Sequence, residues 1–205
     1  MHLDALTKDG KAIFPLLAQF REFYLAGGTA VALQIGHRVS VDFDLFTPRK
    51  LPKGLLPRVE KIFGRRAVRP LVNNAEQLTV SVRGVALTFL HYPFPVLRAY
   101  VRVGGQRMLG VPELAATKAY TIGRRGALKD YADIYYILFE KYAVLRDVIA
   151  LAERKYGASF NPRLFLEQLA YLKDIAQTPM RFLKKPVSRA RLQKFFESEV
   201  KKMEI

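Results

Sequence analysis

The segment from residue 23 to residue 46, FYLAGGTAVALQIGHRVSVDFDLF, constrains the fold of this chain more than any other. FYLA is a short apolar run typical of a buried strand, and a glycine pair follows it. TAVALQIG has the composition of an apolar helix that Thr29 caps and Gly36 ends. SVDFDLF then alternates polar and apolar residues, which is typical of a strand. The segment therefore predicts a strand, a glycine turn, a helix and a second strand.

Two carboxylates lie on one face of the second predicted strand. Asp42 and Asp44 share that face with Ser40, because residues i and i+2 of a strand point the same way, about 6.6 Å apart. The opposite face packs into the core and carries Val41, Phe43 and Leu45. Two ionised carboxylates so close repel each other, and a divalent cation between them removes the conflict. Oxygen ligands favour Mg²⁺ or Mn²⁺. The alternative is a solvated strand face.

The glycine pair is the expected complement of the two aspartates. A turn at Gly27 and Gly28 lets a phosphate approach the backbone, and a helix beginning at Thr29 presents N–H groups and a positive dipole end. Either feature alone is ordinary, since most glycine pairs are only turns. Twelve residues, 30–41, separate Thr29 from Asp42, and it is the combination that predicts a site for a nucleoside triphosphate and its metal. The pattern is neither the Rossmann fingerprint nor a Walker A loop.

The periodicity changes near residue 111. We expect a mixed α/β half over residues 1–110 and a helical half over residues 111–205. Helices are predicted at 8–22, 54–64, 112–125, 129–142, 144–157, 161–176 and 188–203, and a hairpin at 77–92 turning at Arg83-Gly84. One or two short strands are expected within 98–110.

The charge of the chain indicates an anionic partner. The chain has 205 residues, half of them hydrophobic, no cysteine, and a formal net charge of +16. Disulfides and thiolate metal sites are therefore excluded, and long-range attraction of polyanions is favoured over a merely basic, soluble surface. No apolar run approaches the ~18 residues of a membrane span, and the early charges argue against a signal peptide. We expect a cytoplasmic protein with no membrane partner.

Basic residues outside the motifs gather in two segments. One segment carries Arg58, Lys61, Arg65, Arg66 and Arg69, and the other carries Arg181, Lys184, Lys185, Arg189, Arg191 and Lys194. A small acceptor does not require so many cations, so they favour an RNA-sized acceptor bound through its phosphates.

A second block, LGVPELAATKAYTIGRRGALKDYADIYYIL, also carries candidate residues. Lys118 on its apolar helix is either a surface lysine or a ligand of phosphate groups. Asp130 is either a charge complement of a helix N-terminus or a functional group, whereas we expect Asp133 to be structural, paired with Lys129 or Arg125. Arg38 either reaches the triphosphate or is a cation at a helix C-terminus, and His37 is expected to be a capping group.

Together the two blocks resemble a known family. Gly-Gly-Thr followed after twelve residues by Asp-x-Asp resembles the signature of the DNA polymerase beta type nucleotidyltransferase superfamily. The fuller string YLAGGTAVALQIGHRVSVDFDLF is similar to the AbiEii/AbiGii toxin family. The second block matches the family pattern through Lys118, Arg124, Arg125, Lys129, Asp130 and Asp133.

The resemblance implies an α+β fold: a polymerase-beta-like nucleotidyltransferase core, with a mixed sheet flanked by helices, as domain 1–110, then a helical C-terminal domain 111–205. It implies Mg²⁺-dependent transfer of a nucleotidyl group from an NTP to an acceptor, in some members the 3′ end of tRNA. Such proteins are typically the toxin of a toxin–antitoxin or phage-defence pair, so an antitoxin is an expected partner. The alternatives are an inactive nucleic-acid-binding module on the same fold and transfer to a protein side chain.

The resemblance also assigns roles to residues. Asp42 and Asp44 are expected to hold the metal, and Lys118 the β- and γ-phosphates of the donor. Asp130 orients Lys118 or assists deprotonation of the acceptor. The nucleotide-binding set is Gly27, Gly28, Thr29, Arg38, Ser40 and Lys118. The third carboxylate of the superfamily is missing from the expected strand GVALTFLHYP, where Thr88 or His91 takes its place.

Overall fold

The computed structural model describes residues 1–176 and 178–203, and the side chain of Arg125 lies outside this description. Seven strands form one mixed sheet in the order β3-β4-β5-β2-β1-β7-β6. The strands are β1 (Tyr24–Ala26), β2 (Phe43–Thr47), β3 (Val68–Asn73), β4 (Gln77–Val82), β5 (Val85–His91), β6 (Val101–Val103) and β7 (Gln106–Met108). At its centre β2 pairs antiparallel with β1 and parallel with β5.

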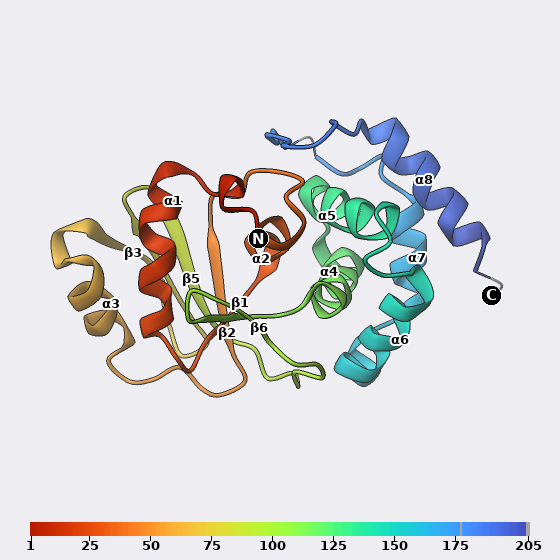
Figure 1. Ribbon diagram of the computed structural model, residues 1–205. Helices are drawn as coiled ribbons and strands as arrows, with labels where there is room; N and C mark the ends of the chain where they lie inside the picture. The colour runs from red at the N-terminus through yellow and green to blue at the C-terminus, as the bar shows by residue number, and fades with distance from the viewer. Residues whose placement is uncertain (177, 204–205) are drawn as a thin grey trace.

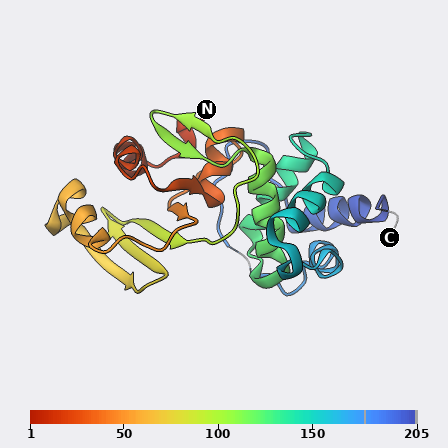
Figure 2. The same ribbon diagram turned by 90° about the horizontal axis from the view of Figure 1, so that it is seen from below.

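Helices gather mainly at one end of the molecule, and the sheet lies at the other (Figure 1, Figure 2). The α-helices are α1 (Lys8–Ile13), α2 (Gly27–Ile35), α3 (Leu55–Phe63), α4 (Val111–Arg125), α5 (Leu128–Phe139), α6 (Leu145–Tyr156), α7 (Pro162–Ala170) and α8 (Arg189–Lys201). Helix α2 contacts β1 and β2 on the sheet side and α4 and α5 on the other. It is therefore the element that joins the strand-rich half to the helical half.

The alternation around the aspartates is confirmed only from Phe43 onward. Phe43 and Leu45 are buried, while Asp44 faces the opposite side of β2. Val41, which we expected in the core, is 55% exposed because the strand begins two residues later. Ser40 and Asp42 lie in the segment that leads into β2, and Ser40 forms only an isolated bridge with Leu6.

Three further elements differ from the sequence prediction. The helix expected over 8–22 is α-helical only to Ile13 and continues as a 3-10 helix over Phe14–Gln19, because Pro15 removes a backbone donor. Strand β3 was not expected, since Pro70 interrupts it and most of its residues are exposed. It forms the edge of the sheet, where proline is tolerated. Helix α7 ends at Ala170, earlier than predicted.

A buried ion pair fixes the segment of chain that connects the sheet to the helical half. Lys155 on α6 contacts Glu113 on α4 at 2.7 Å, and both side chains are almost fully buried. The carboxylate of Glu113 also accepts hydrogen bonds from the backbone N–H groups of Leu97 and Arg98. This ion pair and these hydrogen bonds hold the segment between β5 and β6 against α4 and α6. No helix in the described part of the chain is long and apolar enough to cross a membrane.

Candidate functional site

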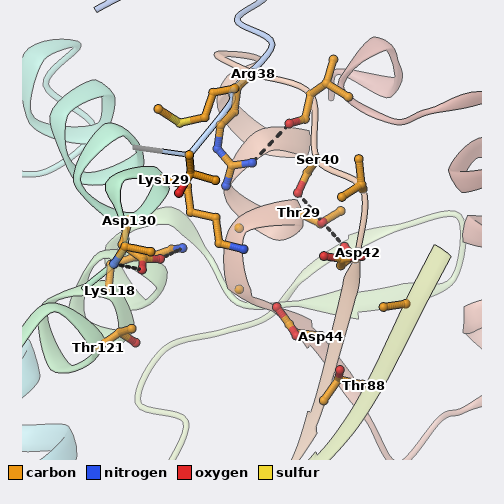
Figure 3. Close-up of a pocket in the computed structure, with 18 of the residues that line it drawn as sticks. Thr29, Arg38, Ser40, Asp42, Asp44, Thr88, Lys118, Thr121, Lys129 and Asp130 are labelled. Carbon is orange, nitrogen blue, oxygen red and sulfur yellow. Dashed lines mark hydrogen bonds and ion pairs between the residues drawn. The ribbon is translucent and has the colours of Figure 1, made fainter. Parts of the chain in front are cut away.

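A cavity of about 820 Å³ lies between the two halves of the chain. All the residues that the sequence indicated for a site line it: Gly27, Gly28, Thr29, Arg38, Ser40, Asp42, Asp44, Lys118 and Asp130. Figure 3 shows the two aspartates on one side and Lys118 with Asp130 on the other, with α2 between them. Two blocks more than 60 residues apart in sequence therefore meet at one cavity.

The glycine turn is shaped by the aspartate opposite it. Gly27 has a φ of +65°, and a Cβ at this position would overlap the carboxylate of Asp44. A Cβ at Gly28 would overlap the guanidinium of Arg38. Helix α2 begins at Gly27, and its N-cap residue, Ala26, provides no side-chain cap. Among the described residues, no side chain caps the first N–H groups of α2, and such a helix N-terminus is an arrangement that binds phosphate groups.

The predicted role of Thr29 as a helix cap is wrong, because the helix begins two residues earlier. Its hydroxyl is buried, donates to the backbone carbonyl of Asp42 and lies 2.8 Å from the hydroxyl of Ser40. These contacts fix the segment that carries Asp42 against the first turn of α2. Thr29 and Ser40 therefore position the carboxylate and the glycine turn relative to each other.

The two aspartates fit a divalent cation of the Mg²⁺ type. Asp42 and Asp44 both line the cavity, and the carboxylate of Asp44 lies against Gly27 in the first turn of α2. Among the described residues, no group of three or more His, Cys, Asp or Glu side chains forms a metal cage. Two carboxylates completed by phosphate oxygens and water are the usual ligand set of Mg²⁺.

Thr88 occupies the position beside Asp44 on the neighbouring strand, β5. The two residues are register partners in the β2–β5 pair, and Thr88 lines the cavity. Its hydroxyl lies 3.2 Å from that of Thr79, which accepts a hydrogen bond from Gln77. His91, the other candidate, pairs with Glu76 and does not line the cavity. Neutral hydroxyls therefore stand on the strand where the resemblance to the superfamily leads us to expect a third carboxylate.

A buried cluster of charges adjoins the cavity. The carboxylate of Asp133 is fully buried and accepts two hydrogen bonds from Arg38, at 2.7 and 3.0 Å. It also contacts the ammonium of Lys118 and Nε2 of His37, each at 2.7 Å. Asp133 is structural, as predicted, but its partners are these three residues and not Lys129. The predicted alternative, Arg125, has its side chain outside the described part.

The same cluster corrects two other expectations. Arg38 is not a cation at the C-terminus of α2, since its guanidinium lies beside Gly28 in the first turn of that helix. His37 is not a cap but a buried partner of Asp133. Burial lowers the pKa of His37, and the hydrogen bond that His37 donates to Asp133 only partly opposes this effect. Burial would raise the pKa of Asp133, but Arg38 and Lys118 together hold that pKa well below its ordinary value.

Asp130 contacts both Lys118 and its own helix. Its Oδ1 lies 2.7 Å from the ammonium of Lys118, which is itself only 6% exposed. Its Oδ2 accepts a hydrogen bond from the backbone N–H of Ala127, at the N-terminus of α5. Both oxygens are thus occupied, which favours an orienting role over proton abstraction.

Sequence reasoning missed two contributors to the cavity wall. Lys129, named from the sequence as part of the family pattern and as a partner for Asp133 but not as a binding residue, lines the cavity and points into it (Figure 3). The second is the segment 178–185, here called the strap, whose residues 178–181 also line the cavity. The backbone N–H of Val39 donates to the carbonyl of Arg181 at 2.8 Å, and that of Leu183 to the carbonyl of His37 at 2.9 Å. No local pattern in the sequence indicates this pairing, because it joins residues more than 140 positions apart.

The fold and the cavity together define a nucleotidyltransferase of the polymerase-beta-like class. The nucleotidyltransferase toxin MenT4 of Mycobacterium tuberculosis is similar over 94% of this chain and 81% of its own, with a TM-score of 0.57 and 17% identity. JHP933 of Helicobacter pylori is similar over 94% and 90%, with a TM-score of 0.51 and 15% identity. ANT(2″)-Ia in complex with adenylyl-2″-tobramycin is similar over 72% and 97%, with a TM-score of 0.51 and 16% identity.

Sequence comparison places the chain within one family of this class. Residues 11–204 match the family described as "Nucleotidyl transferase AbiEii toxin, Type IV TA system". The chain belongs to this family, and it is a nucleotidyltransferase toxin of the type IV toxin–antitoxin kind. The protein aq_aa25 of Aquifex aeolicus, uncharacterized in function, is 30% identical over 155 residues, which cover 75% of each chain.

Proposed function

We propose that the protein transfers a nucleotidyl group from a nucleoside triphosphate to the end of an RNA, in a reaction that depends on Mg²⁺ or Mn²⁺. One observation carries the proposal: the uncapped first turn of α2, at Gly27 and Gly28, faces Asp42 and Asp44 across one cavity. The donor phosphates bind at this turn, with Thr29, Ser40 and Arg38 around them. A divalent cation held by Asp42 and Asp44 neutralises charge on the phosphate oxygens when bound.

The reaction is an in-line displacement at the α-phosphorus. The acceptor hydroxyl forms the new P–O bond, the bond to the β-phosphate oxygen breaks, and pyrophosphate leaves. Lys118 has one N–H left after its contacts with Asp130 and Asp133, and it donates this N–H to the donor phosphates. Asp130 orients Lys118. Because Thr88 replaces a carboxylate and Asp130 is occupied, the proton of the hydroxyl passes to solvent.

The surface charge supports an RNA acceptor, though through fewer residues than the sequence indicated. Four cations of the two basic segments are engaged within the fold: Arg58 with Glu22, Lys184 with Glu140, Arg189 with the carbonyls of Lys173 and Ile175, and Arg191 with the hydroxyl of Tyr135. The others are exposed: Lys61, Arg65, Arg66, Arg69, Arg181, Lys185 and Lys194. Exposed cations bind phosphates without first losing a partner.

Incubation with each labelled NTP and total tRNA, with and without Mg²⁺, tests the proposal. We expect label to enter RNA only with the metal, and Asp42→Ala to abolish transfer while the protein stays folded, as circular dichroism would show. Full activity of this variant, or activity that a chelator does not affect, would contradict the enzymatic proposal. RNA binding without transfer by the wild-type protein would support the inactive binding module, and label in protein would support a side-chain acceptor.

A further inference from the structure

The buried charges beside the cavity cancel one another. Arg38 and Lys118 are two cations, and Asp130 and Asp133 are two carboxylates in direct contact with them. His37, which also contacts Asp133, is neutral near pH 7 because burial lowers its pKa. The cluster therefore directs hydrogen bonds but adds little net attraction for an anion. Lys118 cannot move far toward a ligand without breaking its contacts with two buried carboxylates.

Lys129 differs from the residues of this buried cluster in its exposure and in its ion-pair contacts. It is exposed, and no carboxylate of the described residues lies within ion-pair distance of its ammonium. Its side chain extends from α5 into the cavity, toward the space between Arg38 and the two aspartates (Figure 3). It is the second residue of α5, where the positive end of the helix dipole disfavours a cation. Local stability therefore does not explain a lysine at this position.

The expected ligand requires positive charge from the cavity wall, where the described exposed cations are Lys129 on α5 and Arg181 in the strap. A triphosphate carries several negative charges, and the carboxylate of Asp42 lines the same cavity. We propose that Lys129 contacts the triphosphate of the donor nucleotide and contributes net attraction for it. Lys118 and Asp130 hold the start of α5 so that Lys129 points into the cavity. This inference rests on the proposed function and adds a binding residue to it.

The affinity of the full-length protein for a non-hydrolysable NTP, measured by calorimetry with Mg²⁺, tests the inference. We expect Lys129→Met to weaken binding about tenfold, the effect of removing one charge-assisted contact. The same variant should melt at the wild-type temperature or slightly above it, because a cation leaves the helix N-terminus. Lys129→Arg should keep most of the affinity.

Lys8→Met is the matched control. Lys8 is also an exposed lysine in the first turn of a helix, but it does not line the cavity. We expect its affinity for the nucleotide to equal that of the wild type. Unchanged affinity in Lys129→Met, with binding by the wild type, would overturn this inference alone. A wild-type protein that binds none of the four triphosphates would overturn the proposed function and the inference with it.

Discussion

Gly27 shows how a single residue sets the distance between a backbone and a carboxylate. Its positive φ is open to glycine at no steric cost, and the missing side chain makes room for Asp44. The sequence indicated the need for a glycine here, since the predicted turn required close approach of a phosphate. It did not indicate that the nearest neighbour of Gly27 is the metal-binding candidate itself.

Substitution of Gly27 by alanine tests this crowding. We expect Gly27→Ala to lower transfer about a hundredfold, because the displaced Asp44 no longer holds its geometry. Gly54→Ala is the control, since Gly54 has a φ of +79° and no atom within 4 Å of an added Cβ. It should cost about 1–2 kcal/mol of stability from backbone strain and leave transfer intact. Equal activity of the two variants in the tRNA labelling assay would contradict the argument.

The sequence also did not indicate which residues pair with the buried charges. Asp133 was predicted to be structural, but the sequence offered only its near neighbours as partners. Its actual partners, Arg38 and His37, lie about 95 residues away and meet it through the packing of α2 on α5. Local patterns describe a charge, whereas its partner depends on how the elements pack.

At the level of the elements, the register of β2 and β5 decides what faces Asp44. The hairpin of β4 and β5 was predicted correctly, with its turn at Arg83 and Gly84. The parallel pairing of β5 with β2 was not predictable, because the period of a strand gives its faces but not its neighbour. That pairing places Thr88 directly beside Asp44.

A carboxylate introduced at Thr88 should complete a three-ligand site. We expect Thr88→Asp to tighten Mn²⁺ binding about tenfold, since ligand charge sets the affinity of such sites. Without metal, the variant should be less stable than the wild type because three like charges then share one cavity. Ala86→Asp is the control: it also lines the cavity, but it pairs with Ser81 on β4 and has no partner on β2. Equal Mn²⁺ affinities for Thr88→Asp and the wild type, by calorimetry, would contradict this register argument.

On the scale of the whole molecule, the mixed and helical halves expected from the change in periodicity are both present. The division into domains 1–110 and 111–205 remains a proposal. Buried contacts between the two halves argue against two independently folding units. The buried cluster at Asp133 and the ion pair of Lys155 with Glu113 both join the helices to chain from the first half. We therefore expect the two halves to unfold together.

The free energy of unfolding of the whole protein should depend on pH through His37. Its pKa in the folded protein lies below the usual 6.5, so the unfolded chain binds a proton first as the pH falls. The free energy of unfolding should therefore be constant above about pH 7.5 and decrease as the pH falls through 6.5. The lowered pKa of Asp133 adds a second loss, below about pH 4.

Urea denaturation between pH 5 and pH 8 measures the first loss, and His37→Gln is the matched variant. Glutamine keeps an N–H donor for Asp133 but does not titrate, so the slope between pH 7.5 and 5 should become smaller. A slope that is unchanged in this variant would assign the pH dependence to other groups.

The strap comes late in the sequence, and this position determines when the cavity can form during synthesis. Residues 178–181 line one side of the cavity, and the strap is held there by pairing with residues 37–39. A ribosome makes the glycine turn and both aspartates more than 130 residues before it makes the strap. A nascent toxin therefore carries an unfinished cavity until the strap has left the ribosome, because the other described residues along the cavity wall all precede it in the chain.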